Sequence, residues 1–154
     1  SVSFDVTAIM ASSNTPVSTE VDRGIEMGVS IAGCGNASYT LIGFRLMTTS
    51  GQIYTVVDTT HSGGSTPSSI ETTELPYLSL LAKDKEKLYE DLSLRVLVDH
   101  SMIEVFFVQG ISVSTVRVYA DSSCQDIALY NRNNEQTTPQ VHVNVHVYAM
   151  SSEK

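Results

Sequence analysis

The sequence contains no tryptophan, and aromatic residues make up only 7% of its 154 positions. A tryptophan platform for crystalline polysaccharide is therefore excluded. Charged residues are also scarce, at 17% against about a quarter in average soluble domains. Acidic residues outnumber basic ones by 17 to nine, which gives a net charge of −8. This negative field repels phosphate backbones and anionic lipid headgroups, so neither nucleic acid nor a membrane surface is an expected partner.

The two cysteines, Cys34 and Cys124, are too few for a four-thiolate zinc site or a disulfide-dense scaffold. They are either one disulfide that closes a long loop or two unrelated buried thiols, and the sequence leaves both readings open. Asn36 begins an Asn-Ala-Ser sequon close to Cys34, so it is a candidate for N-glycosylation. Together these features favour the secretory pathway.

Long apolar runs are also missing, because no stretch approaches the roughly 20 residues of a membrane-spanning helix. No basic segment precedes an apolar one near the start, so we expect a signal peptide to be absent or already removed.

What the sequence does have is an alternation of apolar and polar residues with a period of two. The run from Val141 to Tyr148 is the clearest case, with valines at every second position. This pattern is typical of half-buried antiparallel strands. Clusters of Gly, Ser, Asn and Asp interrupt the alternating runs about every 10 residues, which is the spacing of a sandwich or barrel. Further strands are predicted over residues 3–11, 24–32, 38–47 and 52–58, with a loop over 61–69.

The segment from Leu75 to Leu92 is ambiguous, since its leucines recur at spacings that also suit a short amphipathic helix. We favour a strand over Tyr77–Ala82 followed by a charged loop, because the surrounding sequence is all β. Residues 94–119 then predict a three-stranded meander, with turns at 99–101 and at Gln109-Gly110. The predicted fold is all-β: one β-sandwich of two antiparallel sheets over residues 1–154, jelly-roll or concanavalin-like, with no substantial helix.

The meander also carries a family resemblance. The stretch from Leu94 to Phe106, followed by Gly110 and by Thr115 to Tyr119, resembles the L-R-x-x-V-D-x-S-x-x-E-x-F … G … T-x-R-x-Y signature of the C-terminal β-sandwich in the invertase and fructosidase family. Weaker similarity extends over about residues 3–150. The resemblance implies a glycoside hydrolase module that follows a catalytic five-bladed propeller.

The propeller's own motifs (Trp-Met-Asn-Asp-Pro-Asn-Gly, Arg-Asp-Pro and Glu-Cys) do not occur in the chain. We therefore expect no catalytic residues and no hydrolysis by this chain. The resemblance implies two roles: support of a catalytic glycosidase domain, with assembly into a homo-oligomer as a further expectation, or free-standing, lectin-like recognition of a fructoside or another sugar. It also implies a secreted, extracellular or vacuolar location.

Among the carboxylates, Asp99 and Glu104 invite comparison with the pair of a retaining glycosidase, whose carboxyl groups lie about 5 Å apart. Five residues of extended strand would separate them by roughly 16 Å, so Asp99 is interpreted as a turn former that binds local backbone N–H groups. The meander register places Arg117 diagonal to Glu104. Glu104 and Arg117 are therefore predicted to form either a structural ion pair or a pair that binds sugar hydroxyls.

The histidines do not predict a metal site. His142 and His146 lie on one side of a strand but about 13 Å apart, too far to share one ion. Gly63-Gly64 lacks the Lys and the helix of a phosphate loop, and Ser62 and Ser101 lack a nucleophile turn. We expect neither a metal nor a cofactor.

Overall fold

The computed structural model describes residues 2–10, 24–34, 37–47, 50–79, 91–120, 123–133 and 141–149. These residues form ten strands: β1 Val2–Met10, β2 Gly24–Gly33, β3 Thr40–Met47, β4 Gln52–Asp58, β5 Ile70–Ser79, β6 Asp91–Asp99, β7 Met102–Phe107, β8 Ser112–Arg117, β9 Asp126–Asn133 and β10 Val141–Ala149. The described ranges contain no regular helix, because the single turn at Val108–Gly110 has positive φ at all three residues. None of these residues forms a helix long and apolar enough to cross a membrane.

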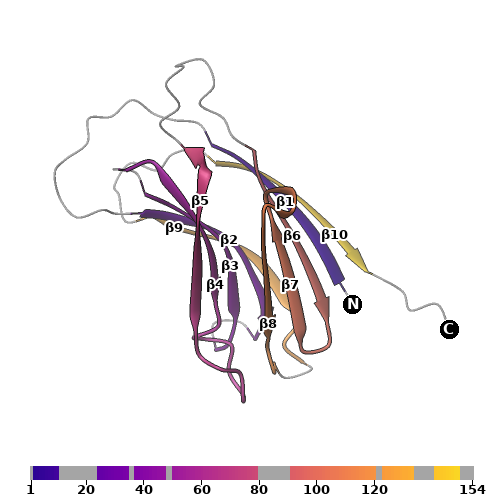
Figure 1. Ribbon diagram of the computed structural model, residues 1–154. Helices are drawn as coiled ribbons and strands as arrows, with labels where there is room; N and C mark the ends of the chain where they lie inside the picture. The colour runs from indigo at the N-terminus through magenta and orange to yellow at the C-terminus, as the bar shows by residue number, and fades with distance from the viewer. Residues whose placement is uncertain are drawn as a thin grey trace.

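The strands form two five-stranded antiparallel sheets that face each other (Figure 1). Sheet A has the order β10-β1-β6-β7-β8, and sheet B has the order β5-β4-β3-β2-β9. The prediction of an all-β sandwich of two antiparallel sheets is confirmed. Both sheets contain strands from distant parts of the chain, because β1 lies between β6 and β10 and β2 pairs with β9.

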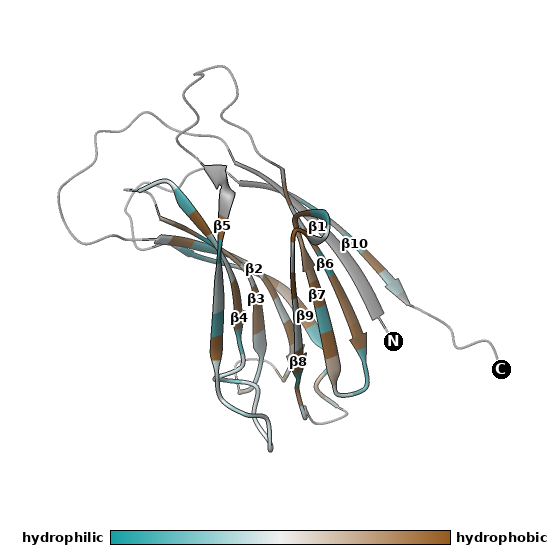
Figure 2. Ribbon diagram, viewed as in Figure 1, coloured by the Kyte–Doolittle hydropathy of each residue, from teal (hydrophilic) through white to brown (hydrophobic). Residues whose placement is uncertain are grey.

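The core fills the space between the two sheets, because apolar residues alternate with polar ones along the strands (Figure 2). Buried residues recur at every second position along β2, β6 and β7. The large side chains that are most completely buried are Phe107, Ile31, Ile42, Leu46, Ile53, Leu92, Leu94 and Ile103. Phe44 of sheet B meets Phe107 of sheet A edge to face, at 5.5 Å between ring centroids. The opposite set of side chains is left on the outer faces.

The β7–β8 hairpin has the register that the sequence predicts, with Met102 opposite Arg117. Gln109 and Gly110 are its two central residues, at φ 56° and 92°, and the Ile111 N–H donates to the Val108 carbonyl oxygen at 3.2 Å. These are the backbone angles of a type I′ turn. The loop is longer than the predicted two residues, because Val108 also has a positive φ of 49° and the last strand pair is Phe107 with Ser112. The turn thereby fixes which outer-face residues are neighbours on β7 and β8.

Two strands of sheet B differ from the prediction. β5 begins at Ile70, whereas the sequence predicted a start at Tyr77. The earlier start was not predicted because the first residues of the strand (Glu71, Thr72, Thr73 and Glu74) are polar and exposed and show no apolar alternation. β9 was not predicted, and its Ile127 and Leu129 remain exposed at the edge of the sheet. The sequence predicted that the strand beginning at Tyr77 ends at Ala82 and is followed by a charged loop. Both Ala82 and that loop lie outside the described residues.

Candidate functional site

The first candidate site lies on the outer face of sheet A, where the β6–β7 turn meets β8. Asp99 is paired with Met102, and Met102 with Arg117. Glu104 is the next outward-facing residue along β7, opposite Thr115. Glu104 and Arg117 are therefore diagonal neighbours on one face, as predicted from the hairpin register.

The predicted separation of Asp99 and Glu104 is wrong. That prediction treated the residues as points along one extended strand, but the hairpin folds β7 back along β6. Because Asp99 pairs with Met102, Asp99 and Glu104 are also diagonal neighbours, at about 7–8 Å on the same face. Asp99, Glu104 and Arg117 thus surround the exposed Met102 side chain. Of these three residues, Asp99 is the one that the sequence predicted to lie far from Glu104.

This proximity does not make the two carboxylates a glycosidase pair. A general acid for glycoside cleavage needs surroundings that keep it protonated, which in practice means an apolar enclosure. The Asp99 side chain is 60% exposed, and its carboxylate oxygen lies 2.8 Å from His100 Nδ1. The Asp99 carboxylate therefore contacts the His100 ring rather than a backbone N–H, although the residue does end β6 at a turn.

The structural alternative for Glu104, an ion pair with Arg117, is not found among the described residues. The Arg117 guanidinium instead donates to Ser101 Oγ at 3.4 Å. Glu104 is half-buried and Arg117 is exposed, so both offer polar atoms on an open surface. The arrangement can bind hydroxyl groups, with two carboxylates as acceptors and one guanidinium as donor.

A second polar cluster lies on the outer face of sheet B, and sequence reasoning missed it. Glu26 of β2 is only 7% exposed and is paired in register with Arg45 of β3 on one side and Arg132 of β9 on the other. Arg45 donates two hydrogen bonds to Glu26 Oε2, at 2.7 and 3.1 Å. Arg132 approaches Glu26 Oε1 at 3.8 Å. Tyr130 lies two residues before Arg132 on β9 and therefore on the same face. Glu26, Arg45, Arg132 and Tyr130 together form the sheet B cluster.

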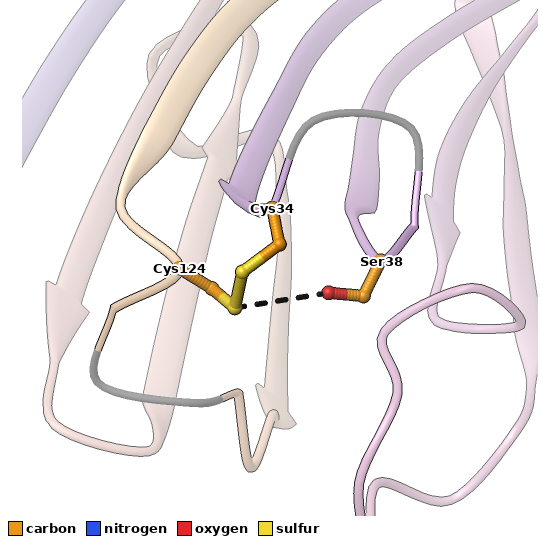
Figure 3. The surroundings of a disulfide bond; sticks show 3 residues. All are labelled: Cys34, Ser38 and Cys124. Atoms are coloured by element: carbon orange, nitrogen blue, oxygen red, sulfur yellow. Dashed lines mark hydrogen bonds between the residues drawn. A yellow bond between two sulfur atoms is a disulfide. The ribbon is translucent and has the colours of Figure 1, made fainter.

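The two cysteines are joined in a disulfide at the end of the sandwich that holds the β2–β3 connection (Figure 3). Cys34 follows β2, and Cys124 lies just before β9. The Ser38 hydroxyl donates to Cys124 Sγ at 3.9 Å. The glycosylation candidate Asn36 lies outside the described residues.

No group of three or more His, Cys, Asp or Glu residues in the described ranges is arranged to hold a metal ion. His146 is exposed and stacks on Tyr148, with ring centroids 6.3 Å apart, whereas the His142 side chain lies outside what the structure describes. His61 stacks in a similar way on Tyr39, at 4.9 Å. These histidines contact aromatic rings on the surface.

Comparison with known proteins assigns the fold to a family. Residues 2–149 match the family described as "Glycosyl hydrolases family 32 C terminal". The chain belongs to this family. It is 33% identical over 107 residues to a fructan 6-exohydrolase from Beta vulgaris, a match that covers 69% of the chain and 17% of that protein.

Two solved structures have the same fold over nearly the whole of this chain. Fructan 1-exohydrolase IIa from Cichorium intybus, solved in complex with 1-kestose, superposes with a TM-score of 0.67 at 18% identity, covering 99% of this chain and 31% of that one. Sucrose-6-phosphate hydrolase from Lactobacillus gasseri gives a TM-score of 0.58 at 20% identity, covering 97% and 25%. The chain therefore spans a third or less of these relatives and corresponds to their C-terminal module, not to their catalytic domain.

Proposed function

We propose that this chain is the non-catalytic β-sandwich of a β-fructoside-cleaving glycoside hydrolase, that residues 1–154 form one sandwich domain, and that this domain packs against the catalytic propeller. The observation that carries the proposal is the match of residues 2–149 to the C-terminal family, in a chain that spans only 17–31% of the relatives just described. A module of this kind supports the catalytic domain by covering part of its surface.

The outer face of sheet A supports this packing role. Phe106 of β7 lies opposite Val113 of β8, and Ile111 follows at the hairpin turn. Val113 is 55% exposed and Ile111 is 59% exposed. Apolar side chains that cluster in this way on a sheet surface are typical of interaction sites. This face therefore supplies a surface that a neighbouring domain, or a second copy in a homo-oligomer, would cover.

The packing role predicts a stability effect that appears only when the catalytic domain is present. In a chimera that carries this chain in place of the matching segment of the Beta vulgaris enzyme, Val113→Asp would bury an unpaired charge and lower the melting temperature by about 4 °C or more. The isolated chain should keep its melting temperature after the same substitution, because Val113 is exposed there. Ser65→Asp, in the exposed β4–β5 loop, is the matched control.

Two results would contradict the packing role. One is an equal effect of Val113→Asp in the chimera and in the isolated chain. The other is release of fructose from sucrose, inulin or levan by the purified chain, because a supporting module contains no catalytic pair.

A second candidate function is lectin-like sugar recognition by Glu104 and Arg117 in a free-standing protein. The observation that favours it is the convergence of Asp99, Glu104 and Arg117 on one open face, with Glu104 and Arg117 not engaged with each other. Calorimetric titration with fructose and levan oligosaccharides tests it. Millimolar binding should be lost in Glu104→Ala and kept in Glu74→Ala, which removes a carboxylate from sheet B. Binding that survives in Glu104→Ala would contradict this assignment.

We also propose that the protein passes through the secretory pathway to an extracellular or vacuolar location. A disulfide persists in oxidising compartments, and the Cys34–Cys124 bond supports such a route. The curated relative is a plant fructan exohydrolase, which fits the same route.

A further inference from the structure

The hydroxyl group of Tyr130 is buried without a hydrogen-bond partner, the one such side-chain atom recorded among the described residues. Burial, and after it the negative charge of Glu26, raises the pKa of Tyr130 well above its ordinary value. The group is therefore always an O–H donor. A buried donor without an acceptor lowers the stability of a folded protein, so its presence requires a reason.

The Tyr130 side chain extends across the outer face of sheet B, from the edge strand β9 toward the middle of the sheet. Tyr130 pairs with Gly28 of β2, which pairs in turn with Gly43 of β3, so no side chain from these two strands blocks its path. The hydroxyl is influenced by the charge of Asp58, a residue of β4, as well as by Glu26. The hydroxyl thus lies over the interior of the sheet rather than at its rim.

The groups around this hydroxyl combine hydrogen-bond donors with acceptors. Glu26 supplies carboxylate oxygens, of which Oε2 is held by Arg45 while Oε1 has the longer 3.8 Å contact with Arg132. Arg132 also lies over the Tyr130 ring, at 5.9 Å from its centroid. The Arg132 side chain is 49% exposed and comes from an edge strand, so it is the part of the cluster that moves most easily.

Phenylalanine at position 130 would give a more stable fold than tyrosine, because it would fill the same space without a buried donor that lacks an acceptor. We propose that the Tyr130 hydroxyl and the Glu26 carboxylate form a binding site for a neutral, sugar-like polyol, with the Arg132 side chain as its movable cover. A polyol hydroxyl accepts a hydrogen bond from Tyr130 and donates one to Glu26 Oε1 when Arg132 swings toward solvent.

The charges of the cluster favour a neutral ligand. The positive charges of Arg45 and Arg132 are partly neutralised by Glu26, and Asp58 adds a second negative charge that acts on the hydroxyl. An anion would face both carboxylates, and a cation would face both arginines. The choice of a sugar-like ligand rests on the sugar recognition proposed above. The site itself is separate, because it lies on sheet B, whereas Glu104 and Arg117 lie on sheet A.

The test is titration of the full chain with D-fructose and with sucrose, followed by calorimetry and by backbone amide shifts in β2 and β9. Wild-type protein should bind with a millimolar dissociation constant, and Tyr130→Phe should weaken binding at least about fivefold, the effect of one lost hydrogen bond. Tyr130→Phe should also melt at the same or a higher temperature than wild type, which separates loss of binding from loss of fold.

Two control variants separate this site from its alternatives. Tyr148→Phe, at an exposed tyrosine of β10, and Glu74→Ala, at an exposed residue of β5, should both leave the fructose affinity unchanged. Unchanged affinity in Tyr130→Phe would overturn the proposal, because the hydroxyl would then bind an ordered water only. Loss of binding in Glu104→Ala alone would favour the sheet A site instead, and no binding of either sugar at tens of millimolar would also overturn the inference.

Discussion

Replacing Arg45 by methionine should lower the free energy of unfolding by about 3 kcal/mol, because it leaves the Glu26 carboxylate buried without its main partner. The side chain of Glu26 is 9% exposed, and among the described residues Arg45 provides both of its short hydrogen bonds. Arg132 offers only a contact at 3.8 Å. Methionine preserves much of the volume of the Arg45 stem, so the loss reports the charge rather than a cavity. Urea unfolding, followed by far-UV circular dichroism, measures it.

The opposite replacement, Glu26→Gln, should cost only about 1 kcal/mol. Both arginines are substantially exposed and can be solvated, and the glutamine oxygen still accepts from Arg45. Adding Glu26→Gln to Arg45→Met should therefore restore part of the lost stability, since no buried charge then remains. Equal losses in the two single variants, or simple additivity in the double variant, would show that Glu26 is effectively solvated in the folded protein.

The outer-face neighbours on sheet A could be predicted because they depend on local signals. The Gln109-Gly110 turn fixes the register of one hairpin, and that register places Arg117 opposite Met102 and diagonal to Glu104. The turn at 99–101 is an equally local signal. Counting residues along one extended strand predicts a large separation between Asp99 and Glu104, whereas the β6–β7 hairpin brings the two together.

The sheet B cluster could not be predicted, because one of its three strands, β9, is distant in sequence from the other two. Glu26 and Arg45 are joined by a hairpin, but Arg132 and Tyr130 arrive on β9, about 100 residues later, after the chain has passed through sheet A. No local pattern indicates which strand will pair with the free edge of β2. The two cysteines are the one pair of residues in the sequence that could have indicated it, since they flank β2 and β9.

Removing the disulfide should be the other large loss of stability. In Cys34→Ala/Cys124→Ala we expect the free energy of unfolding to fall by about 4.6 kcal/mol, the chain-entropy value for a loop of 90 residues. Urea unfolding of the double variant measures the change, and the reduced wild-type protein should match it. A loss below about 1 kcal/mol would contradict the prediction, because it would mean that the bond hardly restricts the unfolded chain.

The loss of stability should be greatest near the disulfide, because the bond lies where the pairing of β9 with β2 is weakest. The β2–β9 register shifts between Ser30 and Gly33, and beyond that irregularity the last pair is Gly33 with Asp126, next to the bond. Amide hydrogen exchange in β9 should therefore accelerate more than in β3, which pairs on both sides. Since β9 carries Tyr130 and Arg132, reduction should also loosen the sheet B cluster and weaken fructose binding there, while β7 and β8 keep their protection.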